Sequence, residues 1–386
     1  MGVLHLVRTE HYRGNANVKK IAIVGASYLQ LPLIEKAKSM GFETHVFAWA
    51  ANDVGEKAAD HFYPISIVEK DQIAEKCREI GVCGICSIAT DLGNYTVNYV
   101  ANKLGLPGNS MECARISTNK HLMREAFEKN GDPSPRSIMV DETTDLESLS
   151  LTYPVIVKPT DRSGSRGIHK LQSPDGLKEA VRNAIGCSFE KKALIEEFAE
   201  GQEYSVEGIS YNGEHHILAM TLKYTTGAPY FIETGHLEPA PVSSETFEKV
   251  RKTVCHALDT LQVRNSASHS EIKIDGQGNI RIIEIGSRMG GDAIGSDLVY
   301  YSTGIDFVRC VIDVACGRAP DLTPKREGCR AEVRFIMTMD DLEEFNRIKR
   351  ENPESILRIV DEVHPEAIGK ATDSSNRGGC YIIRVS

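Results

Sequence analysis

The stretch SASHSEIKIDGQGNIRIIEIGSRMGGD, residues 266–292, contains two strand-like segments joined by a glycine-rich turn. Charged residues alternate with isoleucine on both sides of the turn, which is typical of paired β-strands. The second segment reaches Glu284 and then runs at once into Arg288 and the double glycine at positions 290 and 291. A hairpin on the surface needs no such ending, so the stretch predicts a binding site as well as a piece of sheet.

The turn predicts which residues of the two strands face each other. If Asp275 pairs with Ile280, Glu271 lies opposite Glu284, with Cβ atoms about 5 Å apart. Two carboxylates at that distance repel each other by about 3 kcal/mol at an effective dielectric constant of about 20. A divalent cation between them removes the repulsion, and Mg²⁺ binds carboxylates together with phosphate oxygens. The pair therefore indicates a metal site, and two solvated glutamates at an exposed edge are the alternative.

Upstream of this hairpin lie further candidates for binding an anion. The loop DRSGSRG, residues 161–167, follows a strand that ends in Lys158. Glycine N–H groups, serine hydroxyls and two guanidinium groups are suited to wrapping a polyphosphate, although the Walker A pattern is absent. Lys120 and the acids of LIEEFAEGQEYS, residues 194–205, complete the set. An ordinary surface loop and ordinary surface charges are the alternatives for each of them taken alone.

The first third of the chain alternates strand and helix patterns over residues 20–110. This order predicts an α/β unit with a parallel, doubly wound sheet. The dinucleotide fingerprint is absent, because Gly25 is followed by ASYLQL in place of G-x-G-x-x-G. The unit is therefore expected to be Rossmann-like without a need to bind NAD.

The rest of the chain changes character twice. A polar helix with Thr118 as its N-cap is expected first, followed by a small α+β unit over residues 154–198. Longer strands follow from residue 202, with a hairpin turn at Asn212–Gly213. Cys83 and Cys86 form a C-x-x-C within the apolar run GVCGICSIAT. We interpret them as core residues of a strand, with a redox or metal pair as the alternative.

Composition excludes several classes of protein. The 386 residues carry a formal net charge of −9, which argues against nucleic-acid binding. No apolar run approaches the length of a membrane span, and the first 20 residues lack the apolar core of a signal peptide. Ten cysteines without an export signal are typical of reduced thiols, so a cytoplasmic location is expected.

The order of these features resembles the ATP-grasp superfamily over roughly residues 20–310. Within it, the sequence is similar to carboxylate–amine ligases of the L-amino-acid ligase branch, with an N-terminal domain like that of carbamoyl-phosphate synthase large chains. The resemblance implies a Rossmann-like domain followed by a two-lobed ATP-grasp fold. The expected boundaries are 1–113 for the N-terminal domain, 114–200 for a linker helix and small lid subdomain, and 201–386 for the C-terminal lobe.

The resemblance also implies a role for each candidate residue. Those expected at ATP are Lys120 and Lys158 at the phosphates, Ser163, Gly164, Ser165, Arg166 and Gly167 in the closing loop, Glu196 near the adenine amino group, Glu197, Phe198 and Ala199 in the hinge, and Glu203 at the ribose. Those expected at the chemistry are Glu271 and Glu284 as ligands of Mg²⁺ (or Mn²⁺), Arg288 at the transferred phosphoryl group or the substrate carboxylate, and Glu233 and His236 near the amino acids.

One position departs from the family pattern. The superfamily usually has asparagine two residues after the second glutamate, as a third metal ligand, and here Gly286 stands there. Either a water molecule or the Ser287 hydroxyl is expected to substitute, or one metal is held more weakly. Gly290 and Gly291 are expected to let the backbone approach the ligand closely.

The function that this resemblance implies is ATP-dependent amide formation. A small-molecule carboxylate would attack the γ-phosphate of ATP. A small-molecule amine, expected to be that of an amino acid, would then displace phosphate from the acyl phosphate. The alternatives are another ATP-grasp chemistry, such as carboxylation or a purine-pathway ligation, and a nucleotide-binding module without turnover. The missing glycine fingerprint argues against a nicotinamide-dependent oxidoreductase. The resemblance suggests a homodimer, and the sequence does not identify the carboxylate, the amine or the pathway.

Overall fold

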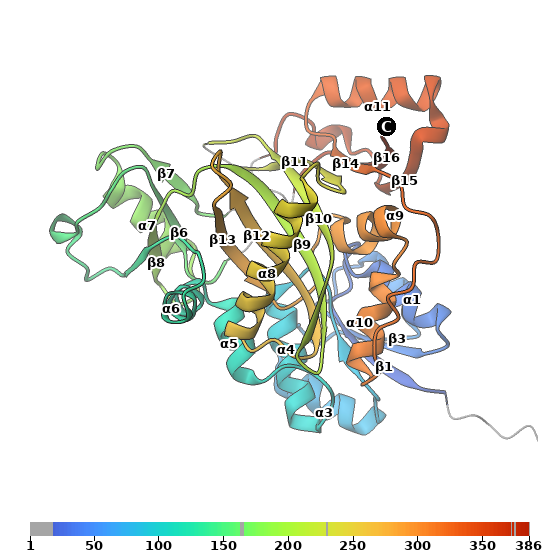
Figure 1. Cartoon of the computed structure of the whole chain (residues 1–386). Helices are drawn as coiled ribbons and strands as arrows, with labels where there is room; N and C mark the ends of the chain where they lie inside the picture. Colours follow the sequence, from blue (N-terminus) through green and yellow to red (C-terminus); the bar gives the residue numbers. More distant parts are fainter. Residues whose placement is uncertain (1–17, 163–165, 229–230, 372, 374–375, 386) are drawn as a thin grey trace, which may run out of the picture.

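Three sheets organise the chain, and Figure 1 shows them side by side. The computed structural model describes residues 18–162, 166–228, 231–371, 373 and 376–385. We call the sheets the N-terminal, the small and the large sheet. They fall within the three predicted segments, whose boundaries at 113 and 200 stay a prediction.

The N-terminal sheet is parallel, with the strand order β3-β2-β1-β4. Its strands are β1 (Lys20–Val24), β2 (Glu43–Phe47), β3 (His61–Tyr63) and β4 (Ile85–Cys86). The helices between them are α1 (Leu31–Ser39), α2 (Val54–Ala58) and α3 (Lys70–Ile80), and α4 (Asp91–Leu104) follows β4. The observed parallel sheet and its helices thus confirm the doubly wound unit predicted from the alternation of strand and helix patterns.

The small sheet is antiparallel, with the order β5-β8-β6-β7. Its elements are β5 (Ser137–Val140), β6 (Val155–Pro159), β7 (His169–Leu171), β8 (Ala193–Glu197) and the covering helix α7 (Leu177–Cys187). Apolar residues of α7 and of the strands form a separate core. This is the predicted α+β unit, and in Figure 1 it extends to the left of the molecule.

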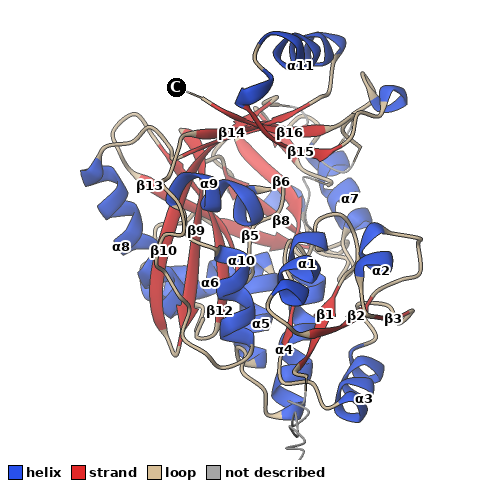
Figure 2. Cartoon of the chain, turned by 90° about the vertical axis from the view of Figure 1, so that its right-hand side faces the viewer, coloured by secondary structure: helices blue, strands red, loops and turns tan. Residues whose placement is uncertain are grey.

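The large sheet is antiparallel and has eight strands, in the order β13-β12-β9-β10-β11-β14-β16-β15. They are β9 (Gln202–Tyr211), β10 (Glu214–Thr225), β11 (Glu233–Glu238), β12 (Ser266–Ile274), β13 (Ile280–Gly286), β14 (Ala331–Phe335), β15 (Ile356–Asp361) and β16 (Cys380–Arg384). The hairpin predicted at Asn212–Gly213 is confirmed as the β9–β10 connection. The last three strands join the same sheet near the top of Figure 2, close to α11 (Met339–Glu351).

Helices cover both faces of the large sheet. On one face, α8 (Ser244–Thr260) packs against β9, β10, β12 and β13, together with α5 (Met111–Thr118) and α6 (Lys120–Asn130). On the other face, α10 (Phe307–Ala315), which follows α9 (Val299–Thr303), shares one apolar core with the large sheet, α1 and the N-terminal sheet. The N-terminal unit is therefore fixed to the large sheet by a common core, which lets it contribute side chains to a site there.

The hairpin of residues 266–292 pairs Glu271 with Glu284, as predicted. The turn register is different, because Ile274 and not Asp275 pairs with Ile280. A β-bulge between the two ends of the ladder adds one residue, Ile283, to β13 and restores the glutamate pairing. The bulge could not be read from the sequence, since alternation alone does not mark an extra residue.

Two local predictions need correction or refinement. Thr118 ends α5, and Asn119 caps α6 by accepting hydrogen bonds from the N–H groups of His121 and Leu122. Asparagine is as good an N-cap as threonine, so the shift by one residue follows ordinary capping preference. Cys86 is buried in β4, as predicted, whereas Cys83 precedes the strand, is only partly buried and has its Sγ 3.9 Å from Cys316 Sγ, so the prediction of a core strand residue holds for Cys86 alone. Among the described residues, no helix combines the length and the apolar character needed to cross a membrane.

Candidate active site

A cleft lies between the small sheet and the large sheet and gathers many of the charged residues singled out in the sequence. The predicted site residues that line it are Lys120, Lys158, Glu196, Glu197, Phe198, Ala199, Glu203, Glu233, Glu271, Glu284 and Arg288. They come from α6, β6, β8, β9, β11, β12, β13 and the adjoining loops, so segments up to 168 residues apart meet in one place.

Three groups of predicted residues lie elsewhere or outside the described part. His236 is buried behind the cleft, with only 1% of its surface exposed. Arg166 and Gly167 of the predicted closing loop do not line the cleft, whereas Arg162 does. Ser163, Gly164 and Ser165 lie outside the described residues, so their expected contact with phosphates stays a prediction.

Lys223 on β10 is the centre of an acidic cluster at one wall of the cleft. Its Nζ lies 2.7 Å from Glu271 Oε1, 3.0 Å from Glu203 Oε1 and 3.7 Å from Glu233 Oε1. Burial alone would lower the pKa of Lys223, but these carboxylates outweigh it and raise the pKa well above its usual value. Burial would likewise raise the pKa of Glu271, yet Lys223 and His269 hold it well below its usual range. Both groups are therefore charged at neutral pH.

Glu284 has its own cation on the opposite side. Its Oε1 lies 2.7 Å from Nζ of Lys120, which also donates to the Arg162 carbonyl at 2.9 Å. The expectation that repulsion between Glu271 and Glu284 requires a metal is thereby corrected. Each carboxylate already faces a lysine, so the charges of the glutamate pair are compensated without a divalent ion.

A buried triad forms the base of the cleft. Glu196 accepts from Lys158 Nζ at 2.6 Å and lies 2.9 Å from Arg124 Nε, and all three side chains are almost completely buried. Burial would raise the pKa of Glu196, but the two cations outweigh it and lower the pKa. The bulged strand contributes as well, because the carbonyl of its extra residue, Ile283, accepts from Arg124 Nη2 at 2.6 Å.

The segment after β8 runs along the rim. Just before it, the carboxylate of Glu197, the last residue of β8, accepts from Arg136 Nε at 2.6 Å, at the surface. The N–H of Phe198 donates to the Pro154 carbonyl at 3.2 Å, and Lys170 Nζ lies 3.3 Å from the centre of the Phe198 ring. These contacts tie the segment to the small sheet while its backbone borders the cleft.

Arg288 is held by a residue from the N-terminal unit. Its Nε donates to Asp91 Oδ1 at 2.7 Å, and its Nη2 lies 3.4 Å from Asp91 Oδ2. A Cβ built on Gly286 would lie 3.2 Å from the same Asp91 oxygen, so a side chain there would require this pair to shift by a few tenths of an ångström. Glycine at position 286 therefore leaves room for Asp91 and Arg288 to meet.

The structure opposes the expectation that Ser287 replaces the missing asparagine. Its hydroxyl lies 2.9 Å from Asn94 Nδ2 and 2.8 Å from Ser117 Oγ, and the residue is 1% exposed. It does not line the cleft. A buried hydroxyl with two partners on that side is not available to a metal at Glu284.

The double glycine also has another reason than the expected one. A Cβ on Gly290 would come within 2.7 Å of His269 Nδ1 and Glu207 Oε1, and the Gly290 N–H donates to Glu207 Oε2 at 3.1 Å. Gly290 is therefore needed for close packing against a buried Glu207–His269 pair. Neither it nor Gly291 borders the cleft.

Beside the cleft, His236 belongs to a second buried network. Its Nε2 lies 3.7 Å from Asp292 Oδ2, and among the described residues neither ring nitrogen has a hydrogen-bond partner. Burial lowers the pKa of His236, so the imidazole is neutral at pH 7. Arg377 clamps Asp292 with distances of 2.6 and 3.0 Å. A neutral imidazole with unused nitrogens is suited to meeting a small polar ligand.

Taken together, the cleft has the chemistry of a site for a polyanion and a divalent cation. Lysines 120, 158 and 223 and Arg288 supply positive charge, and paired carboxylates on neighbouring strands supply hard oxygen ligands. Residues 151–297, which include most of this cleft, match the family model of the ATP-grasp domain. The chain contains an ATP-grasp domain.

Solved structures agree with this ATP-grasp assignment at the level of the fold. The L-amino acid ligase from Bacillus licheniformis superposes with a TM-score of 0.80 over 95% of this chain and 93% of that chain, at 23% identity. Phosphoribosylglycinamide synthetase from Anaerococcus prevotii gives a TM-score of 0.73 over 95% and 94%, at 22% identity. Both the N-terminal unit and the ATP-grasp domain are therefore in the arrangement that these proteins share.

Sequence relatives extend the likeness to named ligases. Alanine–anticapsin ligase of Bacillus subtilis is 26% identical over 291 residues, which is 68% of this chain and 60% of that protein. Human carnosine synthase 1 is 23% identical over 353 residues, which is 83% of this chain and 42% of that protein. The matches thus span 51 to 60% of the length of the alanine–anticapsin ligases and less of carnosine synthase.

Several residues in or beside the ATP-grasp cleft were not predicted from the sequence. Lys223 shares a face of β10 with Thr221, and the alternation of the strand does not reveal that this polar face is buried. Asp91 could not be found, since it starts a helix of a different unit, 197 positions before its partner Arg288. Arg124 and Arg377 were equally hidden, because a single charged residue in a helix or loop gives no signal of burial.

Proposed function

We propose that the protein is an ATP-dependent carboxylate–amine ligase that forms an amide between small molecules, with amino acids among its substrates. The carboxylate oxygen of one substrate attacks the γ-phosphorus of ATP, and ADP leaves. The amine of the second substrate then attacks the carbonyl carbon of the acyl phosphate, and phosphate leaves with the formation of the C–N bond. The products are amide, ADP and inorganic phosphate.

The observation that carries the proposal is the alignment of Glu271 and Glu284 across one strand pair, inside a cleft that also holds Lys120, Lys158 and Arg288. A triphosphate carries several negative charges, and phosphoryl transfer depends on neutralising and positioning them. The two carboxylates fit Mg²⁺, because it prefers hard oxygen ligands. When bound, Mg²⁺ would neutralise phosphate charge, with Glu271 and Glu284 as its protein ligands.

The residues around the cleft divide the work. Lys120 and Lys158 bind phosphate oxygens after release from Glu284 and Glu196, which hold them in the ligand-free protein. The guanidinium of Arg288 bridges the substrate carboxylate and the phosphoryl group, for which its planar fork of donors is suited. Asp91 keeps that guanidinium oriented by accepting from Nε. Glu203 is assigned to the ribose, and Glu196 with the segment 197–199 to the adenine side.

The substrate amino acids are assigned to the region of Glu233 and His236. Glu233 lines the cleft, and neutral His236 lies directly behind it with Asp292 and Arg377. An α-ammonium group is attracted by Glu233, and a neutral imidazole provides one donor or acceptor for a polar substrate atom. The names of the relatives, alanine–anticapsin ligase and carnosine synthase, support amino acids as the substrate class.

A substrate screen tests the proposal. ADP and phosphate release would be measured with ATP, Mg²⁺ and pooled L-amino acids, and separately with other carboxylates, each with and without hydroxylamine. We expect release that depends on a carboxylate, a product mass equal to the two substrates minus water, and loss of turnover in Glu271→Gln with the fold retained. Release that depends on bicarbonate alone would favour carboxylation, and tight MgATP binding without any turnover would favour a nucleotide-binding module.

The remaining assignments rest on the sequence. A cytoplasmic location is supported by the ten cysteines, all of which are free thiols in the structure. A homodimer is proposed on the resemblance alone, and light scattering of the purified full chain measures it directly.

A further inference from the structure

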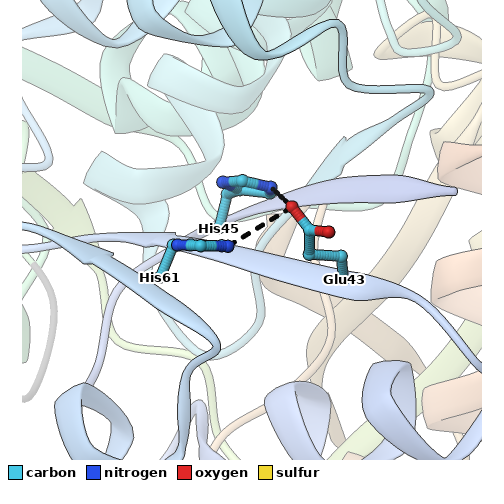
Figure 3. A group of neighbouring side chains, drawn as sticks. All are labelled: Glu43, His45 and His61. Atoms are coloured by element: carbon cyan, nitrogen blue, oxygen red, sulfur yellow. Dashed lines mark hydrogen bonds and ion pairs between the residues drawn. The ribbon is translucent and has the colours of Figure 1, made fainter. Parts of the chain in front are cut away.

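A cluster of possible metal ligands lies on the N-terminal sheet, and none of its residues lines the cleft. Glu43, His45 and His61 place one carboxylate oxygen and two ring nitrogens within 4.8 Å of one another. Figure 3 shows the two imidazole rings side by side, each with a nitrogen directed at the same carboxylate. None of the three takes part in the proposed ligase site.

The strand register brings these side chains together. Glu43 and His45 are two residues apart on β2, so they lie on the same face of the sheet. His45 is the direct neighbour of His61 on β3 in the parallel pairing. Since β3 is the edge strand, the cluster is reached from solvent on one side, where His61 is half exposed.

The distances between the ligand atoms suit a small transition ion. His45 Nε2 lies 2.9 Å from Glu43 Oε1, and His61 Nε2 lies 3.3 Å from the same oxygen. Zinc bonds of about 2.0–2.2 Å to nitrogen and oxygen put the ligand atoms of a tetrahedral site about 3.3 Å apart. The rings are stacked with centroids 4.7 Å apart, so binding requires the two ring nitrogens to move closer together. The His61 side chain is half exposed and has room on its solvent side for this adjustment.

A second contact prepares His45 for this role. Its other ring nitrogen, Nδ1, lies 3.0 Å from the Tyr63 hydroxyl. Metal-bound histidines commonly donate their second N–H to an oxygen, which fixes the tautomer that presents the other nitrogen to the ion. Lys20 Nζ is 3.9 Å from Glu43 Oε1, beyond hydrogen-bond distance, so the carboxylate keeps its lone pairs available.

We propose that Glu43, His45 and His61 form a Zn²⁺ site that ties the edge strand β3 to β2. Two nitrogens and one carboxylate oxygen supply three ligands, and water takes the fourth position on the exposed side. The borderline-soft imidazoles select a transition ion over Mg²⁺, which belongs with the all-oxygen ligands of the cleft. The site is independent of the ligase proposal.

Titration of the full chain tests the site. The protein would be stripped with a chelator, supplied with excess Mg²⁺ to occupy carboxylate sites, and titrated with Co²⁺ as a coloured substitute for zinc. We expect one equivalent of Co²⁺ with the intense visible absorption of a four-coordinate ion, displaced by Zn²⁺. Sulfur-to-cobalt charge-transfer absorption must be absent, because it would assign the ion to cysteine thiols.

Matched variants locate the ion. His61→Ala and Glu43→Gln should each weaken binding by at least about tenfold, and Tyr63→Phe should weaken it less. His216→Ala is the control, because His216 is also a strand histidine beside a single glutamate, Glu214, at 3.5 Å. It should leave binding unchanged.

Three results would overturn the site. They are wild-type protein that binds no Co²⁺, binding unchanged in both His61→Ala and Glu43→Gln, and a loss in His216→Ala as large as that in His61→Ala. His61 is half exposed, so its replacement is compatible with folding, and a circular dichroism spectrum equal to that of the wild type verifies this.

Discussion

At the scale of single residues, the cleft is dominated by buried lysines that neutralise partly exposed carboxylates. Lys223 pairs with Glu271 and Lys120 pairs with Glu284. These two lysines compensate the negative charges of the glutamates that face each other across the strand pair. Neutralising one acid therefore removes the partner of a buried lysine instead of relieving repulsion. Truncating one member of a buried pair is destabilising, because the other charge remains buried.

Lys223→Met tests this charge balance. The variant leaves Glu203, Glu233 and Glu271 without their shared cation, so the free energy of unfolding should fall by about 3 kcal/mol in urea titrations at pH 7 without Mg²⁺. Lys252→Met, at an exposed position on α8, is the control and should change stability by less than about 0.5 kcal/mol. Equal stability of the two variants would contradict the central role of Lys223.

Asp91→Ala tests the contact from the N-terminal unit. Without Asp91, Arg288 keeps its charge but loses the oxygen that orients its guanidinium. Turnover should fall by about a hundredfold, as a misplacement of about 1 Å can cost that much, while ATP affinity changes little. Asp71→Ala is the control, because Asp71 also pairs with a cation, Lys103, but lies at the surface. A loss of ATP affinity as large as the loss of turnover would show that Asp91 supports nucleotide binding and not the orientation of Arg288.

At the scale of elements, local patterns predicted the type of each strand and helix better than its exact partners. The alternation of charged and apolar residues predicted the β12–β13 hairpin and placed Glu271 opposite Glu284, because side chains on the same face of two paired strands lie next to each other. The bulge at Ile283 and the cap at Asn119 were missed. The bulge is accompanied by a contact from another segment, the hydrogen bond from Arg124 to the Ile283 carbonyl, which neighbouring residues in the sequence do not reveal. The cap is local, and it was misplaced by one residue because Thr118 and Asn119 are both suitable N-caps.

Strand β11 contains a buried acid whose ionisation should be visible in stability. Burial raises the pKa of Glu238 to about 7 from 4.5, although the hydroxyls of Ser302 and Thr221 partly oppose the shift. At pH values between these two pKa values, Glu238 keeps its proton in the folded protein and loses it in the unfolded chain. The free energy of unfolding should therefore fall as pH rises from 4.5 to 7, by an amount on the order of 2 kcal/mol.

Glu238→Gln should remove this slope. Urea unfolding at pH 5 and pH 7.5 would compare wild type with Glu238→Gln and with Glu245→Gln, an exposed glutamate on α8. We expect the first variant to lose about 2 kcal/mol less than wild type over this interval, and the second to follow wild type. Parallel decreases in all three proteins would mean that Glu238 titrates normally.

At the scale of the whole molecule, the order of motifs along the chain predicted three units and a cleft between two of them. The sequence could not show that the N-terminal unit shares a core with the large sheet, or that it places Asp91 on Arg288. Such long-range packing depends on the relative position of units, for which local periodicity holds no information. The same reason explains why His236 was predicted near the substrates but its partners Asp292 and Arg377 were not.

The measurement that tests the central claim most directly follows oxygen from the carboxylate to phosphate. Common L-amino acids labelled with oxygen-18 in the carboxyl group would be incubated as a pool with the protein, ATP and Mg²⁺, and the released phosphate analysed by mass spectrometry. An acyl-phosphate ligase must transfer one labelled oxygen into each phosphate that accompanies amide formation, and Arg288→Lys should slow this transfer far more than it weakens ATP binding. Amide formation with unlabelled phosphate would contradict the acyl-phosphate mechanism, and no ADP formation with any of these carboxylates would contradict amino acids as its substrates.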